Sequence, residues 1–136
     1  MSTHQKDRLE KLQQTITKLV EESAKGKLVV AEGKKDATAL QELGVNGSVL
    51  TVKTGGKSFL EATAEIEQTG AKEVILLLDF DRRGVEGTKR LQQDLERAKI
   101  KVNVKFWREL KGLVGHEVQC IESLPAYLAT AQQKTK

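Results

Sequence analysis

Short apolar runs alternate with amphipathic stretches through most of the chain. Strand-sized runs occupy residues 27–31, 48–53, 73–78 and 101–106, and stretches with helical spacing lie between them at 36–43, 58–68 and 84–98. Strands that alternate with helices across short loops are typical of right-handed βαβ units and a parallel sheet. The nearly continuous apolar character of residues 28–30 and 74–78 fits central strands buried on both faces. We therefore predict an α/β core with a four-stranded, mainly parallel sheet flanked by helices.

Helical segments precede and follow this core. In residues 1–26, apolar side chains recur at the spacing of one helical face, at Leu9, Leu12, Ile16, Leu19 and Val20. After residue 106 the same spacing is interrupted by two glycines and the only proline, which predicts one broken helix or two short ones. We expect residues 27–106 to form the core of a single structural domain, with 1–26 and 107–136 as helical extensions. The first helix either covers the sheet or mediates dimerisation.

Composition narrows the class of protein. A chain of 136 residues that is 38% hydrophobic and 31% charged fits one globular domain. The single cysteine, Cys120, and a start without an apolar leader predict a cytoplasmic protein without a disulfide framework. The longest apolar run, Val74–Leu78, is far shorter than the roughly 18–20 residues that span a bilayer. A membrane-spanning protein is therefore not expected.

The net charge of +4 is spread evenly along the chain. Residues 1–27 hold 6 basic and 4 acidic side chains, residues 28–106 hold 13 and 12, and residues 107–136 hold 4 and 3. There is no basic tail, and aromatic residues make up only 4%, which leaves little surface for stacking unpaired bases. Charge alone therefore gives a weak indication of an anionic partner.

Three carboxylates follow predicted strands directly. Asp79 and Asp81 come after the run 73–78, and Glu32 comes after the run 28–31. The carboxyl ends of parallel strands meet at one edge of the sheet, where ligands bind in open α/β folds. Residues two apart in an extended segment project to the same side, so Asp79 and Asp81 can converge. If the two strands are neighbours, Glu32 faces them.

Three carboxylates close together require either a proton or a cation between them. Oxygen ligands without a nearby His or Cys favour Mg2+ over Mn2+ or Ca2+, and Mg2+ usually takes further ligands from substrate phosphates. A phosphate ester is then the expected substrate. As an alternative, Asp79 and Asp81 are turn residues that cap a helix beginning near Gly84.

Two short motifs together resemble the Toprim domain of type IA and type II topoisomerases, bacterial-type primases and related nucleases. They are Glu-Gly-Lys-Lys-Asp at 32–36 and Asp-Phe-Asp-Arg-Arg-Gly at 79–84, some 45 residues apart. The resemblance covers residues 27–106 and implies a Rossmann-like Toprim core. The segments 30–37 and 121–125 also look like the ribonuclease that matures five-S ribosomal RNA and the small stand-alone archaeal members, respectively.

The resemblance also implies roles for individual residues. Glu32 matches the family's general acid or base, which can reach the metal, and Asp79 and Asp81 match the pair that holds one or two Mg2+ ions, with Mn2+ as a substitute. Gly33 and Gly84 match small residues that let the chain turn sharply beside the site.

Basic residues flank both motifs. Lys34, Lys35, Arg82 and Arg83 either contact the phosphates of a nucleic-acid backbone or are solvated charges that balance the carboxylates. The stretch 54–58 looks like the end of a phosphate-binding loop, but Thr51 replaces its first glycine, so we interpret it as a turn with Ser58 as a helix N-cap. Tyr127, the only tyrosine, is interpreted as a packing residue rather than a nucleophile.

Two functions are compatible with these residues. The first is a Mg2+-dependent, nuclease-like enzyme acting on phosphodiester bonds of RNA or DNA. The second is a non-catalytic module that uses the metal site to bind nucleic acid, or that joins a processing complex or a second copy through its helical extensions. A chain of 136 residues leaves little room for the clamp or template-binding domains of a topoisomerase or primase.

Overall fold

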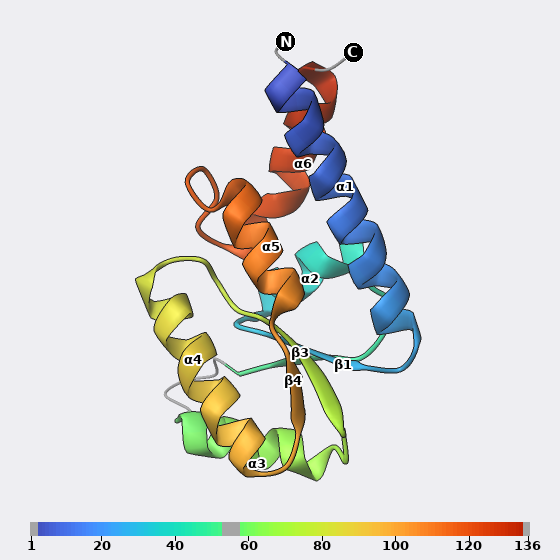
Figure 1. Cartoon of the computed structure of the whole chain (residues 1–136). Coiled ribbons are helices and arrows are strands. Elements are labelled where there is room, and N and C mark those ends of the chain that lie inside the picture. Colours follow the sequence, from blue (N-terminus) through green and yellow to red (C-terminus); the bar gives the residue numbers. More distant parts are fainter. Residues whose placement is uncertain (1–2, 53–57, 135–136) are drawn as a thin grey trace.

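The computed structural model describes residues 3–52 and 58–134 and has an α/β architecture (Figure 1). Its strands are β1 (Leu28–Ala31), β2 (Val49–Thr51), β3 (Glu73–Leu77) and β4 (Lys101–Asn103). Its helices are α1 (Thr3–Ala24), α2 (Lys34–Glu42), α3 (Phe59–Gln68), α4 (Arg82–Arg97), α5 (Lys105–Val114) and α6 (Leu124–Lys134), with a 3-10 helix η1 (Ile121–Ser123) before α6. The predicted fold class, a four-stranded sheet flanked by helices, is confirmed.

The sheet has the order β2-β1-β3-β4, and all of its strands are parallel. The central strands β1 and β3 pair in a register that places Leu28 beside Val74 and Ala31 beside Leu77. The residues that follow these two strands therefore leave the sheet next to each other. This satisfies the condition on which the sequence-based interpretation of Glu32 depended.

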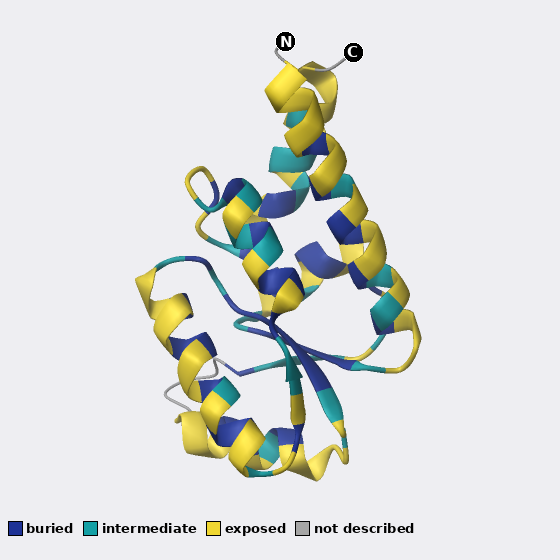
Figure 2. Cartoon of the chain, viewed as in Figure 1, coloured by how far each residue is buried: buried dark blue, intermediate teal, exposed yellow. Residues whose placement is uncertain are grey.

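Helices cover both faces of the sheet, and alternate strand residues belong to two separate cores. One core joins β1 and β3 to α3 and α4, and it includes Val30, Leu76, Leu78, Ile66, Leu91 and Leu95. The other joins the opposite strand faces to α1, α2, α5 and η1, and it includes Val29, Ile75, Leu19, Leu40, Leu110 and Ile121. Figure 2 shows the buried strands between these two layers. Burial on both faces explains why the central strands are apolar throughout.

The segment after residue 106 packs into the core. Trp107, in the first turn of α5, donates a hydrogen bond from Nε1 to the Leu78 carbonyl oxygen at 2.9 Å. Its ring lies 6.3 Å, between centroids, from that of Phe80. Helix α1 packs beside α5, and the two ends of the described chain lie together at the tip of α1 and α6 (Figure 1). No helix within 3–52 and 58–134 combines the length and the apolar character needed to cross a membrane.

Some element boundaries differ from the sequence-based prediction for local reasons. The strand predicted over 101–106 ends at Asn103, whose Oδ1 accepts a hydrogen bond from the Lys105 amide at 2.9 Å, and helix α5 begins there. Ser58 is the N-cap of α3, as predicted, and its hydroxyl accepts a hydrogen bond from the Glu61 amide at 3.1 Å. The rest of the predicted turn, 54–57, and the last residue of the predicted strand 48–53 lie outside the described residues.

Candidate metal centre

Two of the predicted site residues meet at the carboxyl ends of the central strands. Glu32 follows β1 directly, and Asp79 follows β3 after one intervening residue. Because β1 and β3 are neighbours in register, the two side chains come together, and their carboxyl groups form a hydrogen bond. The structure therefore brings Glu32 and Asp79 into one site.

A third carboxylate, Asp36, belongs to the same cluster. One oxygen each of Glu32, Asp36 and Asp79 lie within 4.8 Å of one another. Asp36 is in the first turn of α2, its side chain is buried, and its Oδ2 accepts a hydrogen bond from the Gly33 amide at 3.1 Å. Asp36 was not among the predicted site residues, because the helix predicted over 36–43 begins at this residue and no role in the site was assigned to it. The signal that could have identified Asp36 is its spacing of four residues from Glu32. In the structure α2 begins at Lys34, before the predicted start, so Asp36 lies within its first turn.

The C-terminal segment, here residues 119–122 between α5 and α6, supplies backbone donors to this cluster. The Ile121 amide donates to Asp79 Oδ1 at 3.2 Å, and the next amide, that of Glu122, donates to Asp36 Oδ1 at 3.0 Å. The same segment accepts a hydrogen bond from the Phe80 amide, through the carbonyl oxygen of Gln119 at 2.8 Å. Two consecutive peptide groups at the start of η1 therefore fix the two acids, although they add no positive charge.

Burial and nearby negative charges raise the pKa of two carboxyl groups of the cluster, those of Asp79 and Asp36. Burial, together with the hydrogen bond to Glu32 and the nearby charges of Glu32 and Asp81, raises the pKa of the Asp79 carboxyl to about 7, against the opposing effect of the Ile121 amide. The pKa of Asp36 is also raised, first by burial and then by the charge of Asp79, while the two amides that donate to it act in the opposite direction. At neutral pH the cluster therefore favours either a bound proton or a cation.

Asp81 lies at the start of α4, next to the three-acid cluster in the sequence but not one of its members. It is the N-cap of α4, and its Oδ1 accepts a hydrogen bond from the Gly84 amide at 2.8 Å. This is the capping role that the sequence left open, and it explains why α4 begins at Arg82 rather than near Gly84. Asp81 is not one of the three acids within 4.8 Å, although its charge acts on Asp79. Its contact with a metal stays a prediction.

The two glycines of the motifs differ in how much the fold needs them. A Cβ atom on Gly84 would lie 2.0 Å from the Asp79 carbonyl oxygen, so only glycine lets α4 begin this close to the end of β3. Gly33, the N-cap of α2, has an extended backbone with φ of −140°, and a Cβ atom there would be 3.7 Å from its nearest neighbour, Asp36 Oδ2. The steric reason therefore applies to Gly84 but not to Gly33.

The four flanking basic residues are exposed and lie in the first turns of α2 and α4. Lys34 and Lys35 are exposed in the first turn of α2 and line a groove of about 330 Å³ that also borders Glu122. The Arg82 side chain is 92% exposed and pairs with Glu86 at 3.4 Å, and Arg83 is exposed beside it. Within the described ranges, none of the four forms an ion pair with Glu32, Asp36, Asp79 or Asp81.

The donor set fits a hard divalent cation. All three side chains offer oxygen, and no His or Cys of the described chain belongs to the cluster. Oxygens on opposite sides of one Mg2+ are about 4.2 Å apart, so a set within 4.8 Å needs only a small contraction to share an ion. The groups that would hold the metal are Glu32, Asp36 and Asp79.

The chain is similar to known proteins in sequence and in fold. A family profile described as the Toprim domain matches residues 26–105. A UPF0292 protein of Methanocaldococcus jannaschii is 38% identical over 88% of this chain and 91% of its own length. Another UPF0292 protein, from Methanosarcina acetivorans, is 30% identical over 94% of this chain and 87% of its own length. A solved structure of a putative protein from Aquifex aeolicus has the same fold, with a TM-score of 0.66 and 24% identity over 81% of this chain and 94% of that one.

Proposed function

Because this chain belongs to the Toprim family, whose members bind metal and process nucleic acids, we propose that it is a Mg2+-dependent enzyme acting on phosphodiester bonds of RNA or DNA. The observation that carries this proposal is the convergence of Glu32, Asp36 and Asp79 at the carboxyl edge of the sheet. Three acids with no cationic partner among the described residues suit a substrate that arrives with a metal ion and phosphate.

In this proposal the acidic residues divide two tasks. Asp79 and Asp36, each fixed by a backbone amide of the C-terminal segment, hold the metal, with Asp81 at the start of α4 close to them. Bound Mg2+ supplies positive charge that stabilises the charge developing on phosphate oxygens. Glu32 is half-buried and hydrogen-bonded to Asp79, so it is the carboxyl group best placed to donate or accept a proton at the substrate.

The basic residues would bind the nucleic-acid backbone. Lys34 and Lys35 lie at the start of α2, and Arg82 and Arg83 lie at the start of α4, so the two pairs leave the sheet edge on either side of the cluster. All four are exposed. Contacts of such residues with phosphates position a strand without reading its sequence.

A second candidate function is a non-catalytic module that binds nucleic acid through the same metal site and docks to a processing complex. The observation in its favour is a groove of about 590 Å³ between α1 and α6, the two terminal helices. Apolar residues line part of it, among them Leu9, Leu12, Val114 and Tyr127. A groove of this kind on the helical extensions would suit a partner protein or a second copy.

Cleavage assays with labelled RNA and DNA separate these functions. We expect Mg2+-dependent products from the wild type, and at least a hundredfold less from Glu32→Gln and from Asp79→Asn, because each loses a group that acts at the phosphate. Glu73→Gln makes the same chemical change as Glu32→Gln, but at the opposite end of the sheet, and should keep full activity.

Activity that survives both Glu32→Gln and Asp79→Asn would refute the enzyme proposal. Mg2+-dependent binding without any product, lost in Asp79→Asn, would instead support the non-catalytic module.

A further inference from the structure

Three large apolar side chains are exposed on the described part of the chain. They are Phe59, Leu60 and Val85, which are 40%, 73% and 37% exposed. All three lie in the first turn of α3 or of α4. Both helices follow parallel strands, so their first turns lie at the carboxyl edge of the sheet, the edge that carries the acidic cluster.

The Phe59 ring lies against α4, near the side chain of Leu78. A Cβ atom placed on Gly87 of α4 would be 3.4 Å from two atoms of this ring and 3.3 Å from Leu78 Cδ1. The ring therefore rests on the bare backbone of Gly87, beside the side chain that directly precedes Asp79. The remaining Phe and Trp side chains, Phe80, Phe106 and Trp107, are buried, which leaves Phe59 as the accessible ring of these two types.

A basic residue, Arg83, lies in the first turn of α4. Arg83 precedes Gly87 by four residues, one helical turn, so both are on the same side of the helix. Arg83 is exposed, and it is two residues from Asp81 and four from Asp79. An exposed guanidinium-bearing residue therefore lies on α4 between Asp81, the N-cap, and Gly87, against which the ring packs.

We propose that Phe59 stacks on an unpaired base of a nucleic-acid strand whose backbone lies at the acidic cluster, with Arg83 contacting the phosphate between them. This inference rests on the proposed function and assigns its substrate class: single-stranded or locally unpaired nucleic acid. A ring fixed at the rim of a site can stack on a base that has left the helix, whereas paired bases present only their edges. The guanidinium favours an anionic strand over an apolar protein segment as the occupant.

Binding measurements with the full chain test this inference. Fluorescence anisotropy would compare a labelled 12-nucleotide single strand, the matching duplex and a 12-nucleotide strand without bases, each as DNA, with Ca2+ replacing Mg2+ to suppress cleavage. We expect the wild type to prefer the single strand. Phe59→Ala should weaken that binding about tenfold while leaving the strand without bases unaffected, because stacking on a base is the contact removed.

Matched variants distinguish stacking from general apolar contact. Phe59→Trp should retain the affinity, Phe59→Leu should lose as much as Phe59→Ala, and Leu60→Ala should bind like the wild type. Because Phe59 is partly exposed, all of these variants should fold, and circular dichroism with thermal melting checks that they do.

The remaining outcomes would overturn the inference. If Phe59→Leu keeps the affinity, or Phe59→Ala weakens binding of the strand without bases equally, stacking is wrong. If Phe59→Ala has no effect while Asp79→Asn abolishes Mg2+-dependent cleavage, this inference fails and the proposed function stands. Failure of the wild type both to bind the DNA probes and to bind or cleave labelled RNA and DNA would refute this inference and the proposed function together.

Discussion

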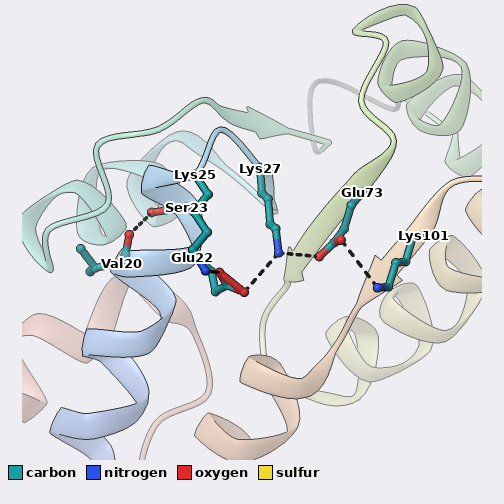
Figure 3. Close-up of polar contacts among 7 residues, drawn as sticks. All are labelled: Val20, Glu22, Ser23, Lys25, Lys27, Glu73 and Lys101. Carbon is teal, nitrogen blue, oxygen red and sulfur yellow. Dashed lines mark hydrogen bonds and ion pairs between the residues drawn. The ribbon is translucent and has the colours of Figure 1, made fainter.

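The two ends of the sheet carry charge in opposite ways. At the amino end, where β1, β3 and β4 begin, charges alternate in sign along a chain of ion pairs (Figure 3). At the carboxyl end, three acids lie together, and their hydrogen-bond partners include backbone amides but no Lys or Arg of the described chain. One end is neutralised by its own side chains, and the other is not.

The ion pairs at the amino end keep their partners ionised. Lys27 Nζ lies 3.1 Å from Glu22 Oε1 and 3.1 Å from Glu73 Oε2, Lys25 pairs with Glu22 at 2.8 Å, and Lys101 is 3.9 Å from Glu73. Lys25 and Lys27 lower the pKa of Glu22, and Glu73 and Glu22 raise the pKa of Lys27. Such partly exposed networks contribute little to stability, and they need nothing from outside the protein.

The carboxyl end shows the reverse. There the fold raises the pKa of Asp79 and Asp36 and holds like charges against their repulsion. A fold keeps such an arrangement at a cost in stability, and perturbed acids at the ligand-binding edge of an α/β sheet are candidates for a functional site. The contrast teaches that the sign pattern of a charge cluster, more than its size, distinguishes a self-compensated cluster from a candidate ligand site in this molecule.

The largest expected effect is the loss of stability when Gly84, at the carboxyl end of the sheet, is replaced. Gly84→Ala would place a Cβ atom against the Asp79 carbonyl oxygen, so we expect a loss of about 3 kcal/mol or more in the free energy of unfolding. At the amino end, Gly26 has φ of +89° but open space around it, and Gly26→Ala should cost only about 1–2 kcal/mol. Urea denaturation measures both, and equal losses would contradict the close approach at Gly84.

A smaller effect is expected from removing one carboxylate charge, which should change the free energy of unfolding in opposite directions at the two ends of the sheet. In EDTA at pH 8, Asp79→Asn removes a carboxylate that burial disfavours, so we expect the free energy of unfolding to rise by about 1–3 kcal/mol after allowing for solvent screening. Glu73→Gln removes a charge that is compensated by Lys27, and it should lower the free energy of unfolding by less than about 1 kcal/mol. Chemical denaturation of both variants gives the signs directly. Destabilisation by Asp79→Asn would remove the distinction between the two ends.

Mg2+ should stabilise the protein in a pH-dependent way. The folded-state pKa of Asp79 is raised, so its contribution to stability is complete below about pH 4 and is lost as pH rises to about 7. Above pH 7 the Asp79 carboxyl group is largely ionised, so Mg2+ need not displace a proton from it. Mg2+ at ten times its dissociation constant should then add about 1.4 kcal/mol to the free energy of unfolding. Thermal melting with and without Mg2+ from pH 5 to 8 checks this. A shift that is the same at every pH, or that persists in Asp79→Asn, would contradict it.

The smallest expected effect is the response of the amino end to salt. The difference in unfolding free energy between the wild type and Glu73→Gln should shrink by less than about 0.5 kcal/mol between 0.05 and 1 M NaCl, because mobile ions screen partly exposed pairs. Denaturation at the two salt concentrations provides the measurement. A difference that grows with salt would show that Glu73 acts through packing instead.

The features that sequence alone could predict depend on local patterns. The strand-helix alternation gave the fold class, and acids placed directly after apolar runs identified Glu32 and Asp79, because strand ends and side-chain direction follow from the order of residues. The neighbouring positions of β1 and β3 were a condition of that interpretation, and only the sheet order established it.

The rest of the site depends on contacts that cannot be predicted from residue types. The amides of Ile121 and Glu122 are present in every peptide bond, and they reach the cluster because α5 folds back across the sheet. Asp36 was only the first residue of a predicted helix, and its burial and its hydrogen bond with the Glu122 amide become visible in the structure alone. Site residues 42 and 86 positions apart in the chain are beyond the range of periodicity arguments.

The hydrogen bonds from Ile121 and Glu122 also bear on where this protein can be divided. The family match ends at residue 105, yet cutting the chain there would remove Trp107 and both amides that hold the acids. A fragment chosen by that boundary would keep Glu32, Asp36 and Asp79 but lose part of their support. In recombination or domain grafting, the acidic edge and the C-terminal helices would have to be exchanged together.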